Sequence, residues 1–142
     1  MSEKIFITWE EFHKDTVKLA EKIKQSGTYD KIVAVSRGGL IPAGILAYEL
    51  NIRNSEAINI SSYDGEKQRS LRDVEISALA GDVNNRTLIV DDLSDSGNTF
   101  RLLRTRFPKA RYVAVYAKPA GRREVDIYIR DMPDEWLIFP WD

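Results

Sequence analysis

Five short apolar runs, most of them rich in β-branched residues, recur along the chain, and most are separated by enough residues to form a helix. They are KIVAV at 31–35, EAINI at 56–60, TLIV at 87–90, RYVAVYA at 111–117 and VDIYI at 125–129. A continuous apolar run such as KIVAV is typical of a strand that is covered on both faces, as in parallel sheets. Strands that alternate with helices predict an α/β fold with a mainly parallel sheet and right-handed crossovers.

Helix signals fill the intervals between these runs. Thr8 followed by Glu11 predicts a capping box. Apolar residues then recur at helical spacing, namely Phe12, Leu19, Ala20 and Ile23, until Ser26 and Gly27 end the segment. A second helix is expected at about 41–50, with Pro42 in its first turn, and a third is marked by Phe100, Leu103 and Phe107.

We predict a single domain over residues 1–142. With 43% hydrophobic residues, a chain of 142 residues has enough apolar material for one core. Two segments lack the strand and helix patterns. The polar segment at about 61–75 is interpreted as a flexible loop or a hairpin arm, and the aromatic, proline-rich segment at about 131–142 as a cap rather than a regular element.

The charge balance excludes a polyanion binder that depends on bulk charge. Lys and Arg number 21 against 22 Asp and Glu, so any phosphate site must be local. The chain has no cysteine, which excludes disulfides and thiolate metal sites. The N-terminal segment has no apolar signal core, and no apolar stretch is long enough to span a membrane, so we expect a cytoplasmic protein.

The stretch TLIVDDLSDSGNT, from Thr87 to Thr99, carries the strongest chemical signal. Asp91 and Asp92 follow the apolar strand, and two neighbouring carboxylates suit a vicinal diol, a metal ion or both. The residues from Ser94 to Thr99 offer backbone N–H groups and hydroxyls at a helix N-terminus, which is an anion site. Acids and small polar residues are also common in turns and helix caps, and the SDSG segment alone would favour that interpretation. The acid pair at the end of an apolar strand favours a ribose phosphate site instead.

This stretch is not a nucleotide P-loop, since GxxxxGK[ST] is absent from the chain, and it does not match the GxGxxG fingerprint of dinucleotide-binding proteins. It resembles the 5-phosphoribosyl 1-pyrophosphate (PRPP) motif of the type I phosphoribosyltransferases. Further segments in the same order resemble the bacterial xanthine-guanine phosphoribosyltransferases over essentially the whole chain: AVSRGGLIPAGILAYEL, ISSYDGEKQR, AKPAGR and WLIFPWD. The resemblance implies a Rossmann-like type I fold with a small hood formed by the terminal segments. Family members commonly continue beyond the position of Asp142 with a further apolar segment, so we expect differences in the hood and the oligomer interface.

The resemblance also implies where PRPP binds. Asp91 and Asp92 hold the ribose hydroxyls, and Asp92 is the best protein contact for Mg²⁺, the implied cofactor. The implied ligands of the 5′-phosphate are Ser94, Asp95, Ser96, Gly97, Asn98 and Thr99, and those of the pyrophosphate are Ser36, Arg37, Gly38 and Arg69. The resemblance also implies a strained peptide between Arg37 and Gly38 that exposes backbone amides. From the residues alone, paired glycines let the backbone approach an anion, although a plain turn after the strand has the same composition.

Three residues are assigned to the purine, and Asp95 to the chemistry. By resemblance, Asp95 is the general base or proton partner at N7, although an N-cap aspartate fits the same position. Lys118 can donate to a carbonyl at position 6 but not to the amino group of adenine, while a solvated strand-end lysine is the alternative. By resemblance, Trp136 stacks on the base and backbone groups near Leu137 contact position 2. The alternative is that the tail aromatics only close the core, which we prefer for Phe139 and Trp141.

The implied activity is transfer of the 5-phosphoribosyl group from PRPP to N9 of guanine, xanthine or hypoxanthine in purine salvage. The implied partners are these small molecules, with no nucleic acid, no integral membrane segment and a homotetrameric assembly; peripheral membrane association is implied by the family alone. Two alternatives stay open: a phosphoribosyltransferase for another base, and a non-catalytic regulator that senses PRPP or a nucleotide. A regulator that binds nucleic acid is expected to have a basic face and often to lack the catalytic acid or the loop arginine. Here the net charge is −1, and both Asp95 and Arg69 are present.

Overall fold

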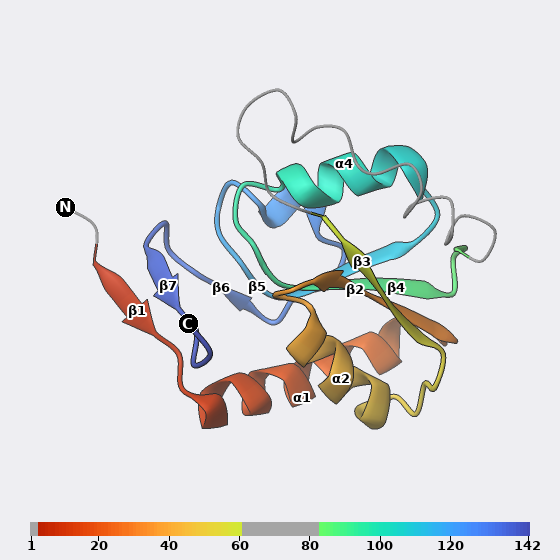
Figure 1. Cartoon of the computed structure of the whole chain (residues 1–142), viewed down its shortest axis with the longest axis horizontal. Coiled ribbons are helices and arrows are strands. Elements are labelled where there is room, and N and C mark those ends of the chain that lie inside the picture. The colour runs from red at the N-terminus through yellow and green to blue at the C-terminus, as the bar shows by residue number, and fades with distance from the viewer. Residues whose placement is uncertain (1–2, 61–82) are drawn as a thin grey trace.

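The computed structural model describes residues 3–60 and 83–142 and has two parallel sheets (Figure 1). The expected loop at about 61–75 and Arg69 lie outside these residues. The elements in chain order are β1 (Lys4–Phe6), α1 (Trp9–Ser26), β2 (Lys31–Ser36), α2 (Leu40–Glu49), β3 (Ser55–Asn59), β4 (Thr87–Ser94), α4 (Asn98–Arg106), β5 (Arg111–Ala117), a 3₁₀ turn (Arg122–Glu124), β6 (Arg130–Asp131) and β7 (Trp136–Ile138). The main sheet has the order β3-β2-β4-β5-β6, and β1 pairs with β7.

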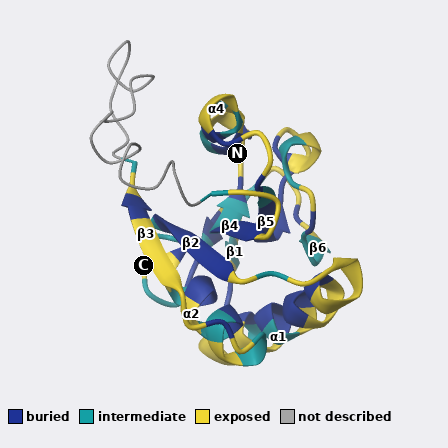
Figure 2. Ribbon diagram, turned by 90° about the vertical axis from the view of Figure 1, so that its right-hand side faces the viewer, coloured by how far each residue is buried: buried dark blue, intermediate teal, exposed yellow. Residues whose placement is uncertain are grey.

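Helices cover both faces of the main sheet, with α1 and α2 on one face and α4 on the other (Figures 1 and 2). Successive strand residues point to opposite faces, so each central strand contributes to two cores. Ile32 and Val90 pack with residues of α1 and α2, whereas Val33 and Ile89 pack with residues of α4. The structure confirms the predicted α/β fold with a mainly parallel sheet.

The predicted capping box begins α1. The Thr8 hydroxyl accepts a bond from the Glu11 N–H at 3.0 Å, and the Glu11 carboxylate accepts one from the Thr8 N–H at 3.4 Å. The apolar positions that predicted this helix, Phe12, Leu19, Ala20 and Ile23, are all fully buried. The local sequence signal and the packed face therefore agree.

The prediction of a strand at 125–129 is wrong. This segment makes only an isolated bridge between Ile127 and Val113, and the fifth strand of the sheet is the short β6. The Asp126 side chain accepts the bond of the Tyr112 N–H at 2.8 Å, a place that a backbone carbonyl takes in a regular ladder. A side chain that bonds to the backbone competes with strand pairing in this way.

The tail predicted as a cap contains a strand. Its residues Trp136–Ile138 form β7, which pairs in parallel with β1 beyond the carboxyl ends of the main strands (Figure 1). We call β1, β7 and the tail to Asp142 the hood. Phe139 stacks on Trp141 with ring centroids 4.8 Å apart, and Trp141 packs edge-on against Phe12 at 5.0 Å. These contacts confirm that Phe139 and Trp141 close the core.

None of the helices within residues 3–60 and 83–142 combines the length and the apolar character needed to cross a membrane.

Candidate active site

Asp91 and Asp92 lie in the last half of β4, which runs four residues further than the apolar run predicted. The Asp92 N–H donates to the Asp91 carboxylate at 2.9 Å. Desolvation by burial, together with the neighbouring charge of Asp92, raises the pKa of Asp91 well above its ordinary value, and burial also raises the pKa of Asp92. Two carboxylates in this situation are stabilised in the ionised form by hydroxyl donors or by a cation.

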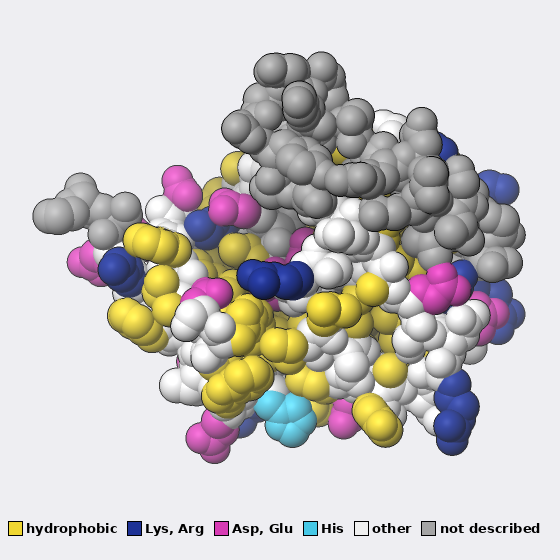
Figure 3. All heavy atoms as spheres, in the orientation of Figure 1, with side chains coloured by type: hydrophobic (Ala, Val, Ile, Leu, Met, Phe, Trp, Pro, Cys, Tyr) yellow, Lys and Arg dark blue, Asp and Glu magenta, His cyan; other side chains and the backbone are white. Residues whose placement is uncertain are grey.

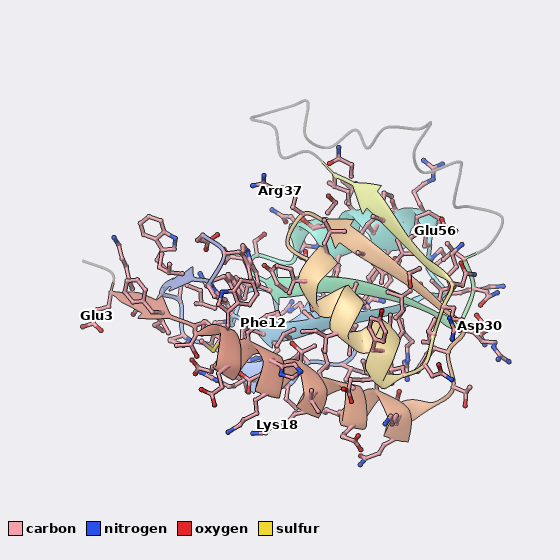
Figure 4. All side chains as sticks on the ribbon, turned by 60° about the horizontal axis from the view of Figure 1, so that its bottom comes forward. Glu3, Phe12, Lys18, Asp30, Arg37 and Glu56 are labelled. Carbon is pink, nitrogen blue, oxygen red and sulfur yellow. The ribbon has the colours of Figure 1, made fainter. Side chains whose placement is uncertain are left out.

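The turn after β2 lies directly against these acids. A Cβ on Gly38 would stand 2.7 Å from Asp92 Oδ2, and one on Gly39 would stand 2.2 Å from the Val90 carbonyl oxygen. Neither position has room for a side chain, so the SRGG sequence allows the close approach of two strand ends. The structure has a cis peptide bond between Ser36 and Arg37, one residue before the unusual peptide that we expected. The exposed Arg37 side chain extends outward from this turn (Figure 4).

A small pocket of about 80 Å³ follows β4. It is lined by Asp91, Leu93, Ser94, Asp95, Ser96, Gly97, Asn98, Thr99 and Phe100. Gly97 is the N-cap of α4 with φ of 90°, a conformation that side chains rarely adopt, and the Asn98 N–H donates to Ser96 Oγ at 3.2 Å. The first turn of a helix presents N–H groups without intrahelical partners, and its dipole favours negative charge. The pocket therefore has the size and polarity of a site for a phosphate group.

Ser94 supports the pocket through its backbone and its side chain. The buried Ser94 hydroxyl donates to the Gly121 carbonyl at 2.9 Å, and the Ser94 carbonyl accepts from the Lys118 N–H at 3.0 Å. A Cβ on Gly121 would stand 2.3 Å from the Ser94 carbonyl oxygen. Gly121 was not among the predicted site residues, although it belongs to the KPAG segment that follows a predicted strand. Ser94 thus links the pocket to the loop that follows β5.

Lys118 lies at the carboxyl end of β5 and is buried, with 7% of the residue exposed. Its ammonium nitrogen stands 3.5 Å from Asp95 Oδ1, and the Asp95 side chain is 66% exposed. Lys118 is therefore not a solvated lysine at a strand end, which was the alternative interpretation. The pair combines a buried donor with an open acceptor beside the phosphate pocket, as a ligand with neighbouring carbonyl and N–H groups requires.

The hood contributes an open aromatic face. Trp136 is 60% exposed, and the Lys4 ammonium lies 4.9 Å from its ring centroid. Leu137 is buried and pairs with Ile5 in the small sheet. Trp136 therefore does not close the core, unlike Phe139. The sequence contained no signal for the contact with Lys4, because it joins opposite ends of the chain.

The predicted site residues within the described ranges thus lie in or just after the carboxyl ends of β2, β4 and β5, or in the hood, at one end of the sheet. Charged side chains of both signs lie near the middle of the face drawn in Figure 3, among hydrophobic side chains. The acid pair offers only oxygen donors, which fits Mg²⁺, an ion that keeps several waters and shares substrate phosphates. Within residues 3–60 and 83–142, no cluster of three or more His, Cys, Asp or Glu residues could hold a metal ion.

Comparisons with known proteins agree with this geometry. The phosphoribosyl transferase domain family matches residues 7–142. The xanthine-guanine phosphoribosyltransferase of Idiomarina loihiensis is 46% identical over 96% of this chain and 86% of its own length.

Solved structures share the fold. A hypothetical protein from Neisseria gonorrhoeae with bound ppGpp is 26% identical, with a TM-score of 0.78 over 100% of this chain and 90% of that chain. The purine phosphoribosyltransferase of Pyrococcus horikoshii is 27% identical, with a TM-score of 0.77 over 98% of this chain and 94% of that chain. A family match over nearly the whole length and a relative this similar show that the chain belongs to the phosphoribosyltransferase family, among the xanthine-guanine phosphoribosyltransferases.

Proposed function

We propose that the protein transfers the 5-phosphoribosyl group of PRPP to N9 of a 6-oxopurine, giving a nucleoside 5′-monophosphate and pyrophosphate. The observation that carries the proposal is the position of the Lys118–Asp95 pair beside the pocket at the start of α4. A base site and a phosphate site that share Asp95 match the two ends of a nucleotide.

The PRPP site is assigned to three segments. Ser96, Gly97, Asn98 and Thr99 bind the 5′-phosphate through backbone N–H groups and hydroxyls, while Ser94 holds the turn. Asp91 and Asp92 accept bonds from the ribose hydroxyls, whose donation stabilises the ionised pair. Ser36, Arg37 and Gly38 bind the pyrophosphate, with Arg69 of the loop as a further ligand. PRPP-dependent enzymes of this family generally use Mg²⁺; here Asp92 would hold the ion together with PRPP oxygens, and the ion would neutralise charge on the pyrophosphate.

The purine site explains selectivity. The Lys118 ammonium donates to O6 of the base, and it repels a base that presents an amino group there. Trp136 offers its exposed ring as a stacking surface, and backbone groups near Leu137 contact position 2. Guanine, xanthine and hypoxanthine share O6, so all three are candidate substrates.

In the reaction, the bond between C1′ and the pyrophosphate oxygen breaks and the bond between N9 and C1′ forms. The purine loses one proton, which Asp95 accepts at N7 in the N7–H tautomer, and pyrophosphate leaves with the electron pair of the broken bond. The protein orients the two reactants and stabilises charge without a covalent intermediate.

A turnover assay tests the proposal. Wild-type protein with PRPP and Mg²⁺ is expected to release pyrophosphate with guanine, xanthine or hypoxanthine but not with adenine. Asp95→Asn is expected to lower kcat by about 10²-fold, the usual range for loss of a general base, while PRPP binding is retained. Asp134→Asn removes an exposed carboxylate from the loop before β7 and serves as the matched control. An unchanged rate in Asp95→Asn removes its proposed role.

The same assay separates the alternatives. Turnover with a different base only favours a phosphoribosyltransferase of other specificity. Binding of PRPP or GMP without turnover of any base favours a nucleotide-sensing regulator. A homotetramer in the cytoplasm belongs to the same proposal, and light scattering of the purified protein measures the subunit number.

A further inference from the structure

Four charged side chains form a cluster behind the phosphate pocket, outside the set assigned to substrate. Arg101 and Arg104 come from α4, and Glu124 and Asp126 come from the 3₁₀ turn and the residues after it. Arg101 Nε lies 3.3 Å from Glu124 Oε2, and Arg104 lies 3.8 Å from Glu124 Oε1 and 3.2 Å from Asp126 Oδ2. Two positive and two negative charges therefore balance within the cluster.

Glu124 lies against the turn that binds the anion. A Cβ on Gly97 would stand 2.7 Å from Glu124 Cγ, so the glutamate side chain packs directly on the N-cap of α4. The Glu124 side chain is 16% exposed, and solvent screens its charge only in part. An unpaired carboxylate at this place opposes an anion bound by the neighbouring N–H groups.

Arg101 contacts two groups that matter to the pocket. Its Nη1 donates to the Asn98 side-chain carbonyl, and its Nε donates to Glu124. Asn98 is one of the pocket-lining residues, and its carbonyl oxygen is an acceptor that an anion does not tolerate. The guanidinium thus holds that oxygen in a hydrogen bond and pairs the carboxylate behind Gly97.

We infer that Arg101 is a positioning residue of the phosphate pocket, which neutralises Glu124 and fixes Asn98 so that the turn accepts the dianionic 5′-phosphate. This inference rests on the proposed function, since the ligand it concerns is the phosphate of PRPP. Arg101 acts through Asn98 and Glu124 and not by direct contact with the sugar.

The test compares KM for PRPP, kcat and thermal stability. Arg101→Gln leaves one arginine for two carboxylates, so KM is expected to rise about three- to tenfold with kcat within twofold of wild type. Arg106→Gln removes the same charge from the far end of α4 and is expected to leave KM unchanged. Arg101→Lys keeps the charge and is expected to restore most of the affinity.

The double variant Arg101→Gln/Glu124→Gln separates neutralisation from direct contact. Removal of both charges is expected to return KM most of the way to the wild-type value, as in a double-mutant cycle with strong coupling, and the remaining difference measures the lost bond to Asn98. A double variant as weak as Arg101→Gln, or an Arg101→Gln variant with wild-type KM, overturns the inference. A wild-type protein that neither turns over nor binds PRPP in calorimetry refutes the proposed function itself, which is a different outcome.

Discussion

Gly38→Ala is expected to impair activity because the missing side chain of Gly38 leaves space for the Asp92 carboxylate. An alanine Cβ would stand 2.7 Å from Asp92 Oδ2 and 2.8 Å from its Oδ1, whereas ordinary contacts begin at 3.4 Å. The carboxylate or the turn must therefore move by about 0.7 Å, the difference between 3.4 and 2.7 Å. Gly38 has no positive φ, so the backbone itself accepts alanine and the substitution isolates the steric effect.

A misplacement of about 1 Å at a reacting group costs about 10²-fold in rate. For Gly38→Ala we expect a loss of about 10- to 100-fold in kcat/KM for PRPP, equivalent to about 1.4 to 2.7 kcal/mol. Steady-state assays of pyrophosphate release measure this loss, and circular dichroism melts check that the variant is folded.

Gly44→Ala is the matched control for this experiment. Gly44 lies within α2, and a Cβ there meets no atom within 4 Å. Activity is expected to be unchanged, and the free energy of unfolding is expected to rise by about 0.5 to 1 kcal/mol, because alanine loses less conformational entropy in a helix. A Gly38→Ala enzyme with wild-type kcat/KM refutes the close approach of the SRGG turn to the acids.

Two further substitutions test the charged groups of the fold. Burial raises the pKa of both Asp91 and Asp92, so the folded ligand-free protein binds more protons than the unfolded chain at pH values between the unfolded and folded pKa. Its stability is therefore expected to fall as pH rises above about 4 through the folded pKa of the pair. Asp91→Asn should flatten this dependence in melts across the pH range while abolishing turnover; an identical pH profile contradicts the shifted pair. Asp15 is buried, and its Oδ2 accepts from the Tyr116 hydroxyl at 2.7 Å and from Arg130 at 2.8 Å. Asp15→Ala is therefore expected to lower the free energy of unfolding in urea by about 2 to 3 kcal/mol. A loss below about 0.5 kcal/mol shows that water replaces these bonds.

The central elements were predictable because their signals are local. The runs at 31–35 and 87–90 are apolar on both faces, as strands between two helical layers must be, and Thr8 with Glu11 contains a complete capping signal. The acid pair and the turn at Gly97 were predictable for the same reason, since Asp91 to Thr99 are contiguous in sequence.

The missed features depend on partners distant in sequence. The short strands β1 and β7 pair Lys4 with Trp136 from opposite ends of the chain, and each has only three residues. The segment 125–129 has strand-like composition, but the Asp126 side chain takes a backbone bond instead. The burial of Lys118 and its pairing with Asp95 also require the folded loops, because a lysine at a strand end is ordinarily solvated.

The proposed activity requires that a ribose phosphate binds where β4 meets α4, and a crystal structure of the protein with GMP tests this most directly. We expect the phosphate within hydrogen-bond distance of the N–H groups of residues 96–99, the ribose hydroxyls at Asp91 and Asp92, and O6 of the base at the Lys118 ammonium. A nucleotide bound elsewhere, or an empty turn in crystals saturated with GMP, contradicts the account.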